Sequence, residues 1–332
     1  MIDLIDVLVL SVSEVRSVLT MDKAIDLVES AFREKGLGRV QMPPKTYLFF
    51  NKYSGDLRVM PAYLESLNAA GVKVVNVHPL NPVKRGLPTV MAIVVIVDPE
   101  TGRPLSIMDG TWLTCVRTAA AAAVATKYLA RSDSKTLGII GAGALAPFHI
   151  DALSRVLRVE SLLIYDVDRG KAERTAIEAQ ERLGVRAIAV SSPREAVEGV
   201  DVLTTLTPSR KPVVLNDWIT GGIHINAMGA DAPGKEELDP LILKRAKIIV
   251  DDFEQAVHSG EVNVPISSGF IDRSCIYAEL GEIIAGLKKG RESSDEVTVF
   301  DSTGLAIQDV IVASYVYSEA VKRGLGKTIT LH

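Results

Sequence analysis

The sequence has little of several features that would each point to a particular class of protein. Its 332 residues include two cysteines, and aromatic residues make up 5% of the chain. Because Cys115 and Cys275 both lie in apolar surroundings, we expect small core residues in a reducing compartment rather than a disulfide or metal ligands. The net charge of −4 offers no electrostatic reason to expect binding to nucleic acid or to an anionic membrane.

Long hydrophobic runs and common hydrolase motifs are also missing. The longest apolar run, Val90–Val97, is far shorter than the roughly 20 residues that a membrane-spanning helix needs. The first residues include acidic side chains and no basic region, which argues against a signal peptide. The five histidines show no zinc-ligand spacing, and no Gly-x-Ser-x-Gly elbow is present, so we expect no metal centre and no serine hydrolysis. These absences predict a soluble, cytoplasmic protein.

The most informative feature that is present is the stretch Gly141-Ala142-Gly143-Ala144-Leu145-Ala146. An apolar run before it is typical of a buried parallel strand, and a helical pattern follows it. The strand is predicted at 136–140, the helix at 147–157, and a second strand at 161–165 that ends on Asp166. A glycine pattern of this kind between a strand and a helix, with an acidic residue about 20 positions on, indicates a dinucleotide site.

Each residue of this pattern has a physical reason to be there. Gly141 allows a tight turn, Gly143 leaves room for a pyrophosphate at the positive end of the next helix, and Ala146 lets that helix pack closely. Asp166 would accept hydrogen bonds from a ribose and repel a 2′-phosphate, which favours NAD over NADP. Arg169 lies close enough to accommodate such a phosphate, so NADP stays an alternative. A glycine turn that binds nothing is disfavoured by this context.

The rest of the chain divides into two patterns. The segment before the glycine pattern predicts one strand and one helix, then four further strands that are mostly antiparallel, and an alanine-rich helix. The first strand is predicted at 7–10, and the helix after it continues through Phe32. The four further strands are predicted at 46–50, 57–60, 70–76 and 90–97, and the alanine-rich helix at 111–130. Strands and helices then alternate, which is typical of a doubly wound parallel sheet. Its strands are predicted at 136–140, 161–165, 187–190, 202–205, 223–228, 248–250 and 298–300.

The predicted fold is therefore α/β, with two domains. A Rossmann-type doubly wound parallel sheet occupies residues 117–303 and binds NAD. An α+β domain for substrate binding and dimerisation is formed by residues 1–116 and 304–332, and the C-terminal helix at 304–323 completes it.

Three residues could carry chemistry on local grounds. Lys73 is flanked by apolar residues in a strand. If its side chain points inward, burial would lower its pKa and suit it to proton transfer. If the side chain points outward, it would lie on the solvent-exposed face of the sheet. Arg117 lies in the middle of a helix and needs an anion, which is either a substrate carboxylate, a phosphate or a structural Asp or Glu. Asp231 follows an apolar strand, where parallel strands face their ligand crevice. His78 and His224 are possible acid–base groups, for which a structural role is favoured.

At these residues the sequence resembles the ornithine cyclodeaminase/μ-crystallin family over essentially its whole length. The segments that carry the resemblance are Met60-Pro61-Ala62-Tyr63, the strand around Lys73, Leu87-Pro88-Thr89, Met108-Asp109-Gly110, Arg117-Thr118-Ala119-Ala120, Gly141-Ala142-Gly143, His224-Ile225-Asn226-Ala227 and Asp301-Ser302-Thr303-Gly304. Within the family it is most similar to the archaeal alanine dehydrogenase branch. The segments that point there are Met42-Pro43-Pro44-Lys45, Thr207-Pro208-Ser209-Arg210-Lys211-Pro212 and the stretch from Gly229 to Lys235.

The resemblance implies roles for many residues. Lys73 would polarise the substrate's carbonyl or imine and move protons, and Asp231 would orient or deprotonate the attacking water or ammonia. Residues near the substrate would be Lys45, Arg117 and Thr303. With alanine as the substrate, Lys45, Arg58 or Arg117 would hold its carboxylate. Residues that contact NAD would be Thr89, Arg117, Gly141, Gly143, Ala144, Leu145, Asp166, Thr207, Met228, Gly229, Ala230, Asp231, Lys235 and Ser302. The family is typically a homodimer whose first domain and terminal helix form the interface.

Two departures from the family pattern bear on the substrate, and Asp166 bears on the cofactor. Arg58 stands where ornithine cyclodeaminases carry an acidic residue for the distal ammonium, and Lys45 replaces their usual arginine. Asp166 differs from the Asn-Arg pair of the μ-crystallin-type ketimine reductases, which suits NADPH. We therefore expect NAD-dependent oxidative deamination of L-alanine to pyruvate and ammonia, and its reverse. The alternatives are reduction of cyclic ketimines such as pyrroline- or piperideine-carboxylate, and ornithine cyclodeaminase activity. A dinucleotide-regulated binding protein is disfavoured because both Lys73 and Asp231 are present.

Overall fold

The chain is built from two compact units. The computed structural model describes residues 5–331. Unit 1 consists of Met1–Thr118 and Leu305–His332, and unit 2 of Ala119–Gly304. The division falls inside one continuous helix, α4 (Thr111–Leu129). Within residues 5–331 no helix is both long and apolar enough to cross a membrane.

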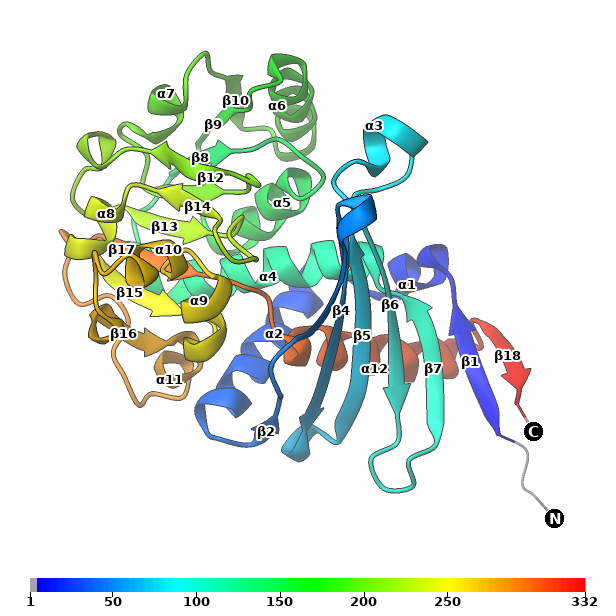
Figure 1. Cartoon of the computed structure of the whole chain (residues 1–332). Coiled ribbons are helices and arrows are strands. Elements are labelled where there is room, and N and C mark those ends of the chain that lie inside the picture. The colour runs from blue at the N-terminus through cyan, green and yellow to red at the C-terminus, as the bar shows by residue number, and fades with distance from the viewer. Residues whose placement is uncertain (1–4, 332) are drawn as a thin grey trace. The chain divides into compact units, whose positions relative to one another are not determined.

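Unit 1 is organised around one sheet, with strand order β18-β1-β7-β6-β5-β4-β2 and β3 paired to β4 (Figure 1). Neighbouring strands pair antiparallel, except that β1 runs parallel to β7. The strands are β1 (Asp6–Leu10), β2 (Val40–Gln41), β3 (Thr46–Phe50), β4 (Gly55–Leu64), β5 (Ala69–Val77), β6 (Val90–Val97), β7 (Pro104–Asp109) and β18 (Lys327–Thr330). The helices are α1 (Val12–Val18), α2 (Met21–Gly36), α3 (Asn81–Arg85) and α12 (Ala306–Arg323), with 3-10 turns η1 (Asn51–Tyr53) and η2 (Glu65–Leu67).

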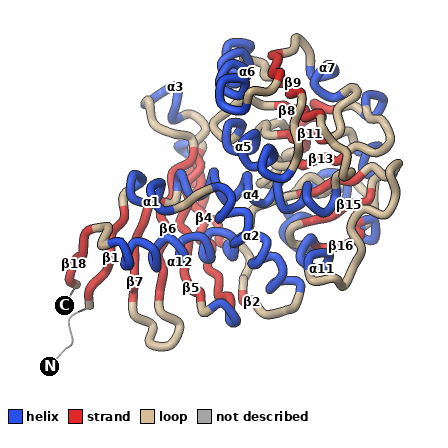
Figure 2. The backbone as a smooth tube through the Cα atoms, turned by 180° about the vertical axis from the view of Figure 1, so that it is seen from behind, coloured by secondary structure: helices blue, strands red, loops and turns tan. Residues whose placement is uncertain are grey.

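One face of this sheet is covered and the other is not. Met60, Lys73 and Val94 are opposite one another in β4, β5 and β6. Because side chains alternate along a strand, they share one face, which α12 crosses with α2 beside it (Figure 2). On the opposite face, Ile93 is 47% exposed and Ile107 is 38% exposed. Among the described residues of unit 1, no helix lies across that second face (Figure 1).

The structure corrects the prediction of a single helix after the first strand. Two helices are present, α1 and α2, and the chain is extended at Leu19 and Thr20 between them. The Thr20 hydroxyl accepts a hydrogen bond from the Lys23 N–H at 3.3 Å. A threonine in this geometry caps a new helix, which offsets the cost of ending the previous one.

The prediction for the cysteines is also wrong in part. Cys115 is partly buried, but Cys275 is exposed. Cys275 ends the 3-10 turn η4 (Arg273–Cys275), just before a strand that was not predicted from the sequence. The apolar neighbours of Cys275 in sequence belong to that strand, so they say nothing about the side chain of the turn residue.

Unit 2 contains a parallel sheet with strand order β10-β9-β8-β11-β13-β17-β15-β16. Its strands are β8 (Thr136–Ile140), β9 (Ser161–Tyr165), β10 (Arg186–Ala189), β11 (Val202–Thr205), β13 (His224–Ala227), β15 (Lys247–Val250), β16 (Ile276–Glu279) and β17 (Thr298–Asp301), and β12 (Arg210–Val214) pairs with β14 (Glu236–Leu238). Its helices are α5 (Ala146–Val156), α6 (Arg169–Leu183), α7 (Pro193–Val197), α8 (Pro240–Arg245), α9 (Phe253–Ser259), α10 (Asn263–Ser267) and α11 (Leu280–Ile284), with a 3-10 turn η3 (Asn216–Trp218).

The first strands of unit 2 run outward from β8 on one side through β9 to β10, and on the other side through β11 to β13. This is the doubly wound order, in which the direction of winding reverses between β8 and β11. A core on one face joins α5 and α6 to the sheet, and a core on the other joins α7, α8 and α9. The predicted α/β class with a doubly wound parallel sheet is confirmed.

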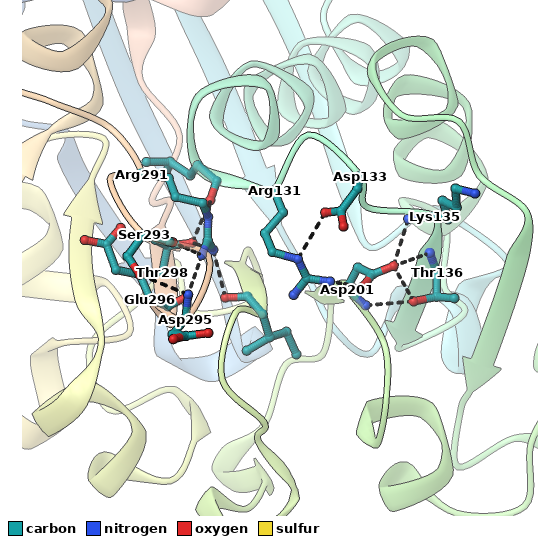
Figure 3. A network of polar contacts seen from close by, with 12 residues as sticks. Arg131, Asp133, Lys135, Thr136, Asp201, Arg291, Ser293, Asp295, Glu296 and Thr298 are labelled. Carbon is teal, nitrogen blue, oxygen red and sulfur yellow. Dashed lines mark hydrogen bonds and ion pairs between the residues drawn. The ribbon is translucent and has the colours of Figure 1, made fainter.

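A polar network holds the amino ends of these strands together (Figure 3). Asp201 accepts hydrogen bonds from the Thr136 N–H at 2.9 Å and from the Arg131 guanidinium. Arg291 donates to the carbonyls of Leu129, Ile223, Ser293 and Glu296 and to the Thr298 hydroxyl. The network lies at the ends opposite to the loops that a ligand would contact, so its role is structural.

Candidate functional site

Lys73 lies inside unit 1, not on a wet face. Its side chain is 1% exposed, and its Nζ forms an ion pair with Asp309 Oδ2 at 2.7 Å. Burial and the positive charges of Arg117 and Lys45 lower the pKa of Lys73, Asp309 raises it, and the resulting pKa is about 7. A lysine with this pKa exchanges its proton readily near neutral pH.

Arg117 is bound to the same carboxylate. It lies on α4 and is 5% exposed. Its Nε donates to Asp309 Oδ1 at 2.8 Å, and its Nη1 donates to Gln308 Oε1 at 2.8 Å. The anion that Arg117 needs is therefore supplied in part by the protein itself. A role with the substrate carboxylate stays a prediction.

Asp309 and Gln308 were not singled out from the sequence. Both lie near the start of α12 and are fully buried. A negative charge near a helix N-terminus is stabilised by the helix dipole. The available signal was the single acidic residue in the stretch from Ala306 to Ala313, which is apolar apart from Gln308 and Asp309, because a buried charge needs a partner.

Arg58 is on the same side of the sheet as Lys73, since it precedes Met60 by two positions in β4. Its guanidinium pairs with Asp56, through Nε to Oδ1 at 2.9 Å and Nη2 to Oδ2 at 3.2 Å. The pair carries no net charge, which reduces the repulsion between Arg58 and a substrate with a distal ammonium. Lys45 lies one residue before β3, close enough to Lys73 to lower its pKa.

The two histidines and Thr89 are held by local contacts. His224 is fully buried, and its Nδ1 lies 3.0 Å from the Thr298 hydroxyl. Burial lowers the pKa of His224 to about 3, so it stays neutral, which fits a structural role. The His78 ring is stacked on Phe50 at 5.8 Å. Thr89 precedes β6, and its carbonyl accepts from the His78 N–H at 2.8 Å.

In unit 2 the glycine pattern forms the turn between β8 and α5. Gly141 has φ +100°, a conformation that favours glycine. A Cβ on Gly141 would meet the Leu206 carbonyl at 3.0 Å, whereas a Cβ on Gly143 would meet nothing within 4 Å. Asp166, just beyond β9, accepts from the Ala142 N–H at 2.7 Å. Ala144 and Leu145 lead into α5. Open space therefore lies above Gly143, at the amino end of a helix.

The loops after β11 and β13 are tied together by one buried carboxylate, Glu237. Its Oε1 accepts from the Thr207 N–H at 2.6 Å and from the Thr207 hydroxyl at 2.7 Å. Its Oε2 accepts from the Thr205 hydroxyl at 2.7 Å and from the Gly229 N–H at 2.8 Å. Thus Thr207 and Gly229, both predicted to contact the dinucleotide, are positioned by a residue that was not predicted.

Asp231 lies in the loop after β13 and forms an ion pair with Lys235. Lys235 Nζ also lies 3.4 Å from the Gly229 carbonyl oxygen. Met228 and Ala230, from the same loop, are buried. The loop therefore presents the Asp231–Lys235 pair beyond the carboxyl end of a parallel strand, where ligands bind in doubly wound sheets.

A second buried carboxylate, Asp251, holds the loop after β17. Its Oδ2 accepts from the Thr303 and Gly304 N–H groups, each at 2.7 Å, and from the Ser302 hydroxyl at 3.3 Å. Ser302 and Thr303 were predicted to face the dinucleotide and the substrate, and Asp251 was not predicted. Unit 2 therefore fixes its loops by backbone N–H groups that donate to buried acids.

Comparison with known proteins identifies the family. Residues 6–324 match the model of the ornithine cyclodeaminase/mu-crystallin family. The chain is 52% identical to an alanine dehydrogenase from Archaeoglobus fulgidus, over 98% of each protein. The chain belongs to this family. The resemblance inferred from the sequence is thereby confirmed, including its direction toward the archaeal alanine dehydrogenase branch.

Solved structures agree with this family membership. An archaeal alanine dehydrogenase dimer with bound NAD is 51% identical, with a TM-score of 0.95 over 98% of this chain and 100% of that one. The Thermococcus litoralis Δ1-pyrroline-2-carboxylate reductase, in complex with NADH and L-proline, is 42% identical, with a TM-score of 0.94 over 97% of this chain and 100% of that one. This family member is an enzyme, an NAD-dependent oxidoreductase.

The turn between β8 and α5 fits that cofactor. A bound dinucleotide needs open space beside a glycine of the turn, and it needs backbone N–H groups at the start of the following helix. Gly143 meets the first requirement, because a Cβ there would enter open space. The start of α5 at Ala146 meets the second. NAD as the cofactor, expected from the sequence, is confirmed.

Proposed function

We propose that this enzyme catalyses the NAD-dependent oxidative deamination of L-alanine to pyruvate and ammonia, and the reverse reductive amination. The charge balance around Lys73 carries the proposal. Lys73 and Arg117 share one carboxylate, that of Asp309, and Lys45 is close enough to act on Lys73. An excess of positive charge suits a substrate with a carboxylate and no distal ammonium. The family relationship to alanine dehydrogenases supports the same choice.

In this proposal unit 1 binds the substrate and unit 2 binds NAD. Lys45, Arg58 and Arg117 hold the substrate carboxylate, while Lys73 accepts a proton from the amine side and returns it in the reverse direction. Asp231 orients the water that adds to the iminium carbon, after which ammonia leaves. NAD held by unit 2 would supply the acceptor for the hydride from the substrate Cα, and Thr303 would lie beside it.

We assign the predicted dinucleotide contacts to four groups of residues. Gly141, Gly143, Ala144 and Leu145 would hold the pyrophosphate, and Asp166, whose charge favours NAD, would hold the adenosine ribose. A third group would come from the loops after β11, β13 and β17: Thr207, Met228, Gly229, Ala230, Asp231, Lys235 and Ser302. The fourth group is the two predicted residues outside these loops, Thr89 and Arg117.

A second candidate function is the reduction of a cyclic ketimine such as Δ1-pyrroline-2-carboxylate. The similarity to the Thermococcus litoralis reductase favours it, and such a substrate also has a single carboxylate and no distal ammonium. The same Lys73 and Asp231 would serve it. Ornithine cyclisation is less well supported, because the Arg58–Asp56 pair replaces a free acidic group.

We further propose that the enzyme is a homodimer formed through the second face of the unit 1 sheet. This face is apolar: Ile93 is 47% exposed, Ile107 is 38% exposed, and Leu48 on β3 is 56% exposed. The half-buried Val59, which pairs with Val74 across β4 and β5, lies on the same face. Contiguous apolar faces of this kind are rare on monomers. Sedimentation analysis of the enzyme tests this, and a monomer at micromolar concentration would refute it.

A substrate panel tests the proposed activity. NADH formation is measured with L-alanine and NAD, and NADH consumption with pyruvate plus ammonium. The same rates are measured with Δ1-pyrroline-2-carboxylate, Δ1-piperideine-2-carboxylate and L-ornithine, each with both nicotinamide cofactors. We expect the highest kcat/KM with L-alanine or pyruvate plus ammonium. A higher kcat/KM with a cyclic imine would assign the second function instead.

A further inference from the structure

The contacts of Asp309 join two groups that the proposed function treats separately. One oxygen, Oδ2, lies 2.7 Å from Lys73 Nζ, and the other, Oδ1, accepts from Arg117 Nε at 2.8 Å. Asp309 has no exposed surface and Lys73 is 1% exposed. Because three charged groups are buried in contact, moving either cation would leave the carboxylate without one of its partners.

The arrangement also fixes the direction of Arg117. Its Nε is bound to Asp309, and its Nη1 to the adjacent residue, Gln308. Two consecutive residues near the start of α12 therefore hold two of the three nitrogens of one guanidinium. A guanidinium held in this way is preorganised, so little rotational freedom remains to be lost when an anion binds.

The charged surroundings of Lys73 make Asp309 its main counterion. Arg117 and Cys115 on α4, and Lys45 just before β3, are close enough to interact electrostatically with Lys73. Burial raises the pKa of the Cys115 thiol to about 11, so that group is neutral near pH 7. Of the neighbours that act on the pKa of Lys73, the cations lower it and Asp309 raises it.

We propose that Asp309 is a positioning residue for the reaction, one whose single carboxylate is the shared counterion that holds Lys73 and Arg117 in place. It rests on the proposed function, because Lys73 has to exchange a proton during turnover. When Lys73 is protonated, this group of three has one more positive charge than negative charges. A substrate with one carboxylate would compensate it, whereas a distal ammonium would add to it.

The test is the pH dependence of kcat/KM for Asp309→Asn, measured with whichever substrate of the panel is turned over. Loss of an opposite charge at contact distance lowers a lysine pKa by about 1–3 units. We therefore expect the limb that reports Lys73 to move to lower pH by that amount. The limb should move to lower pH in both reaction directions, because its position follows the pKa of Lys73. It does not depend on whether the protonated or the neutral amine of Lys73 is the reacting form. We also expect KM to rise on the order of tenfold, as Arg117 loses a charged hydrogen bond.

Two further variants separate charge from packing. Gln308→Ala removes the other contact of Arg117 but no charge, so KM should rise while the limb stays within about half a pH unit of the wild type. Asp309→Glu keeps the charge and changes the length, so kcat should fall while the limb stays in place. Asp309→Glu carries the test by itself if Asp309→Asn does not fold. Thermal unfolding with and without NADH monitors folding in each case.

The variant Lys73→Ala shows which of two proposals has failed: the role of Lys73 in the proposed function, or the positioning role of Asp309. If Lys73→Ala retains the limb, Lys73 does not titrate in turnover and the proposed mechanism is wrong. If Lys73→Ala abolishes the limb but Asp309→Asn leaves it unmoved, the proposed function stands and the role of Asp309 is refuted. A limb that moves by a unit or more to lower pH in Asp309→Glu would likewise refute it, because the countercharge is still present there.

Discussion

Replacing Glu237 by glutamine should weaken both the fold of unit 2 and its affinity for NADH. The carboxylate accepts four hydrogen bonds, from the Thr205 and Thr207 hydroxyls and from the Thr207 and Gly229 N–H groups. In Glu237→Gln one oxygen becomes an NH₂ group, which faces two of these donors and cannot accept from them. The loops after β11 and β13 then lose their common attachment.

The magnitude follows from the four contacts. Each of the two donors left without an acceptor costs about 1–3 kcal/mol when buried. Glutamine carries no charge, so the cost of burying a carboxylate disappears, which stabilises the variant by several kcal/mol at most. Burial raises the pKa of Glu237, while the four donors lower it, so both effects act at this residue. We expect a net destabilisation on the order of 1–4 kcal/mol. The Kd for NADH should rise on the order of tenfold, because one lost charged hydrogen bond has about that effect.

Urea unfolding gives the free-energy change, and fluorescence titration with NADH gives the Kd. The matched control is Glu236→Gln, next to it in β14. Glu236 Oε1 is buried and contacts no hydrogen-bond donor among the described residues, and burial raises its pKa. An amide should therefore replace it at a cost below about 1 kcal/mol. Equal losses in the two variants, or a Glu237→Gln protein with wild-type stability and Kd, would refute the reasoning.

Three further predictions address the site and the core. Lys73→Ala should bind NADH as the wild type does while kcat falls about 10²- to 10⁴-fold; an unchanged kcat would remove Lys73 from the mechanism. Gly143→Val should weaken NADH binding at least ~10-fold, because the side chain would occupy the space above the turn, with little change in Tm since that space is open; a large fall in Tm would contradict this. Burial raises the pKa of Asp301 to about 8, so from about pH 4 to 8 the folded state keeps a proton that the unfolded state releases. Its stability then falls by up to about 1.4 kcal/mol per pH unit. The Tm advantage of Asp301→Asn over the wild type should therefore grow between pH 5 and 8, and a constant difference would argue against a buried proton.

The dinucleotide half of the protein was predictable because its signals are local. The strand at 136–140, the turn and the following strand at 161–165 lie within one short segment, and all three were found at their observed bounds. The missed strand β7 has no such flanking pattern. The short β16 was also missed, since no element was predicted between β15 and β17. The break between α1 and α2 depends on a single capping threonine, which hydrophobic periodicity does not register.

The carboxylates that hold the loops were beyond sequence reasoning. Glu237, Asp251 and Asp309 are buried acids whose partners come from other segments, and no spacing rule pairs an acid with a distant backbone N–H group. Asp251, for example, precedes the loop it holds by 52 residues. Only the order of strands in the sheet brings the two together.

By itself the sequence determined the class of fold, the family and the cofactor, since a glycine turn between a strand and a helix is a local arrangement with one physical use. The sequence did not decide whether the Lys73 side chain points into the core or toward solvent. Valine stands on both sides of the lysine, so the strand shows no clear alternation between a buried face and a solvent-exposed face. The tertiary structure decided this. It places α12 over that face, and Asp309, 192 residues after Arg117, supplies the charge that both cations share. A charge can be buried only where its partner is, and partners so far apart in sequence meet only in the folded chain.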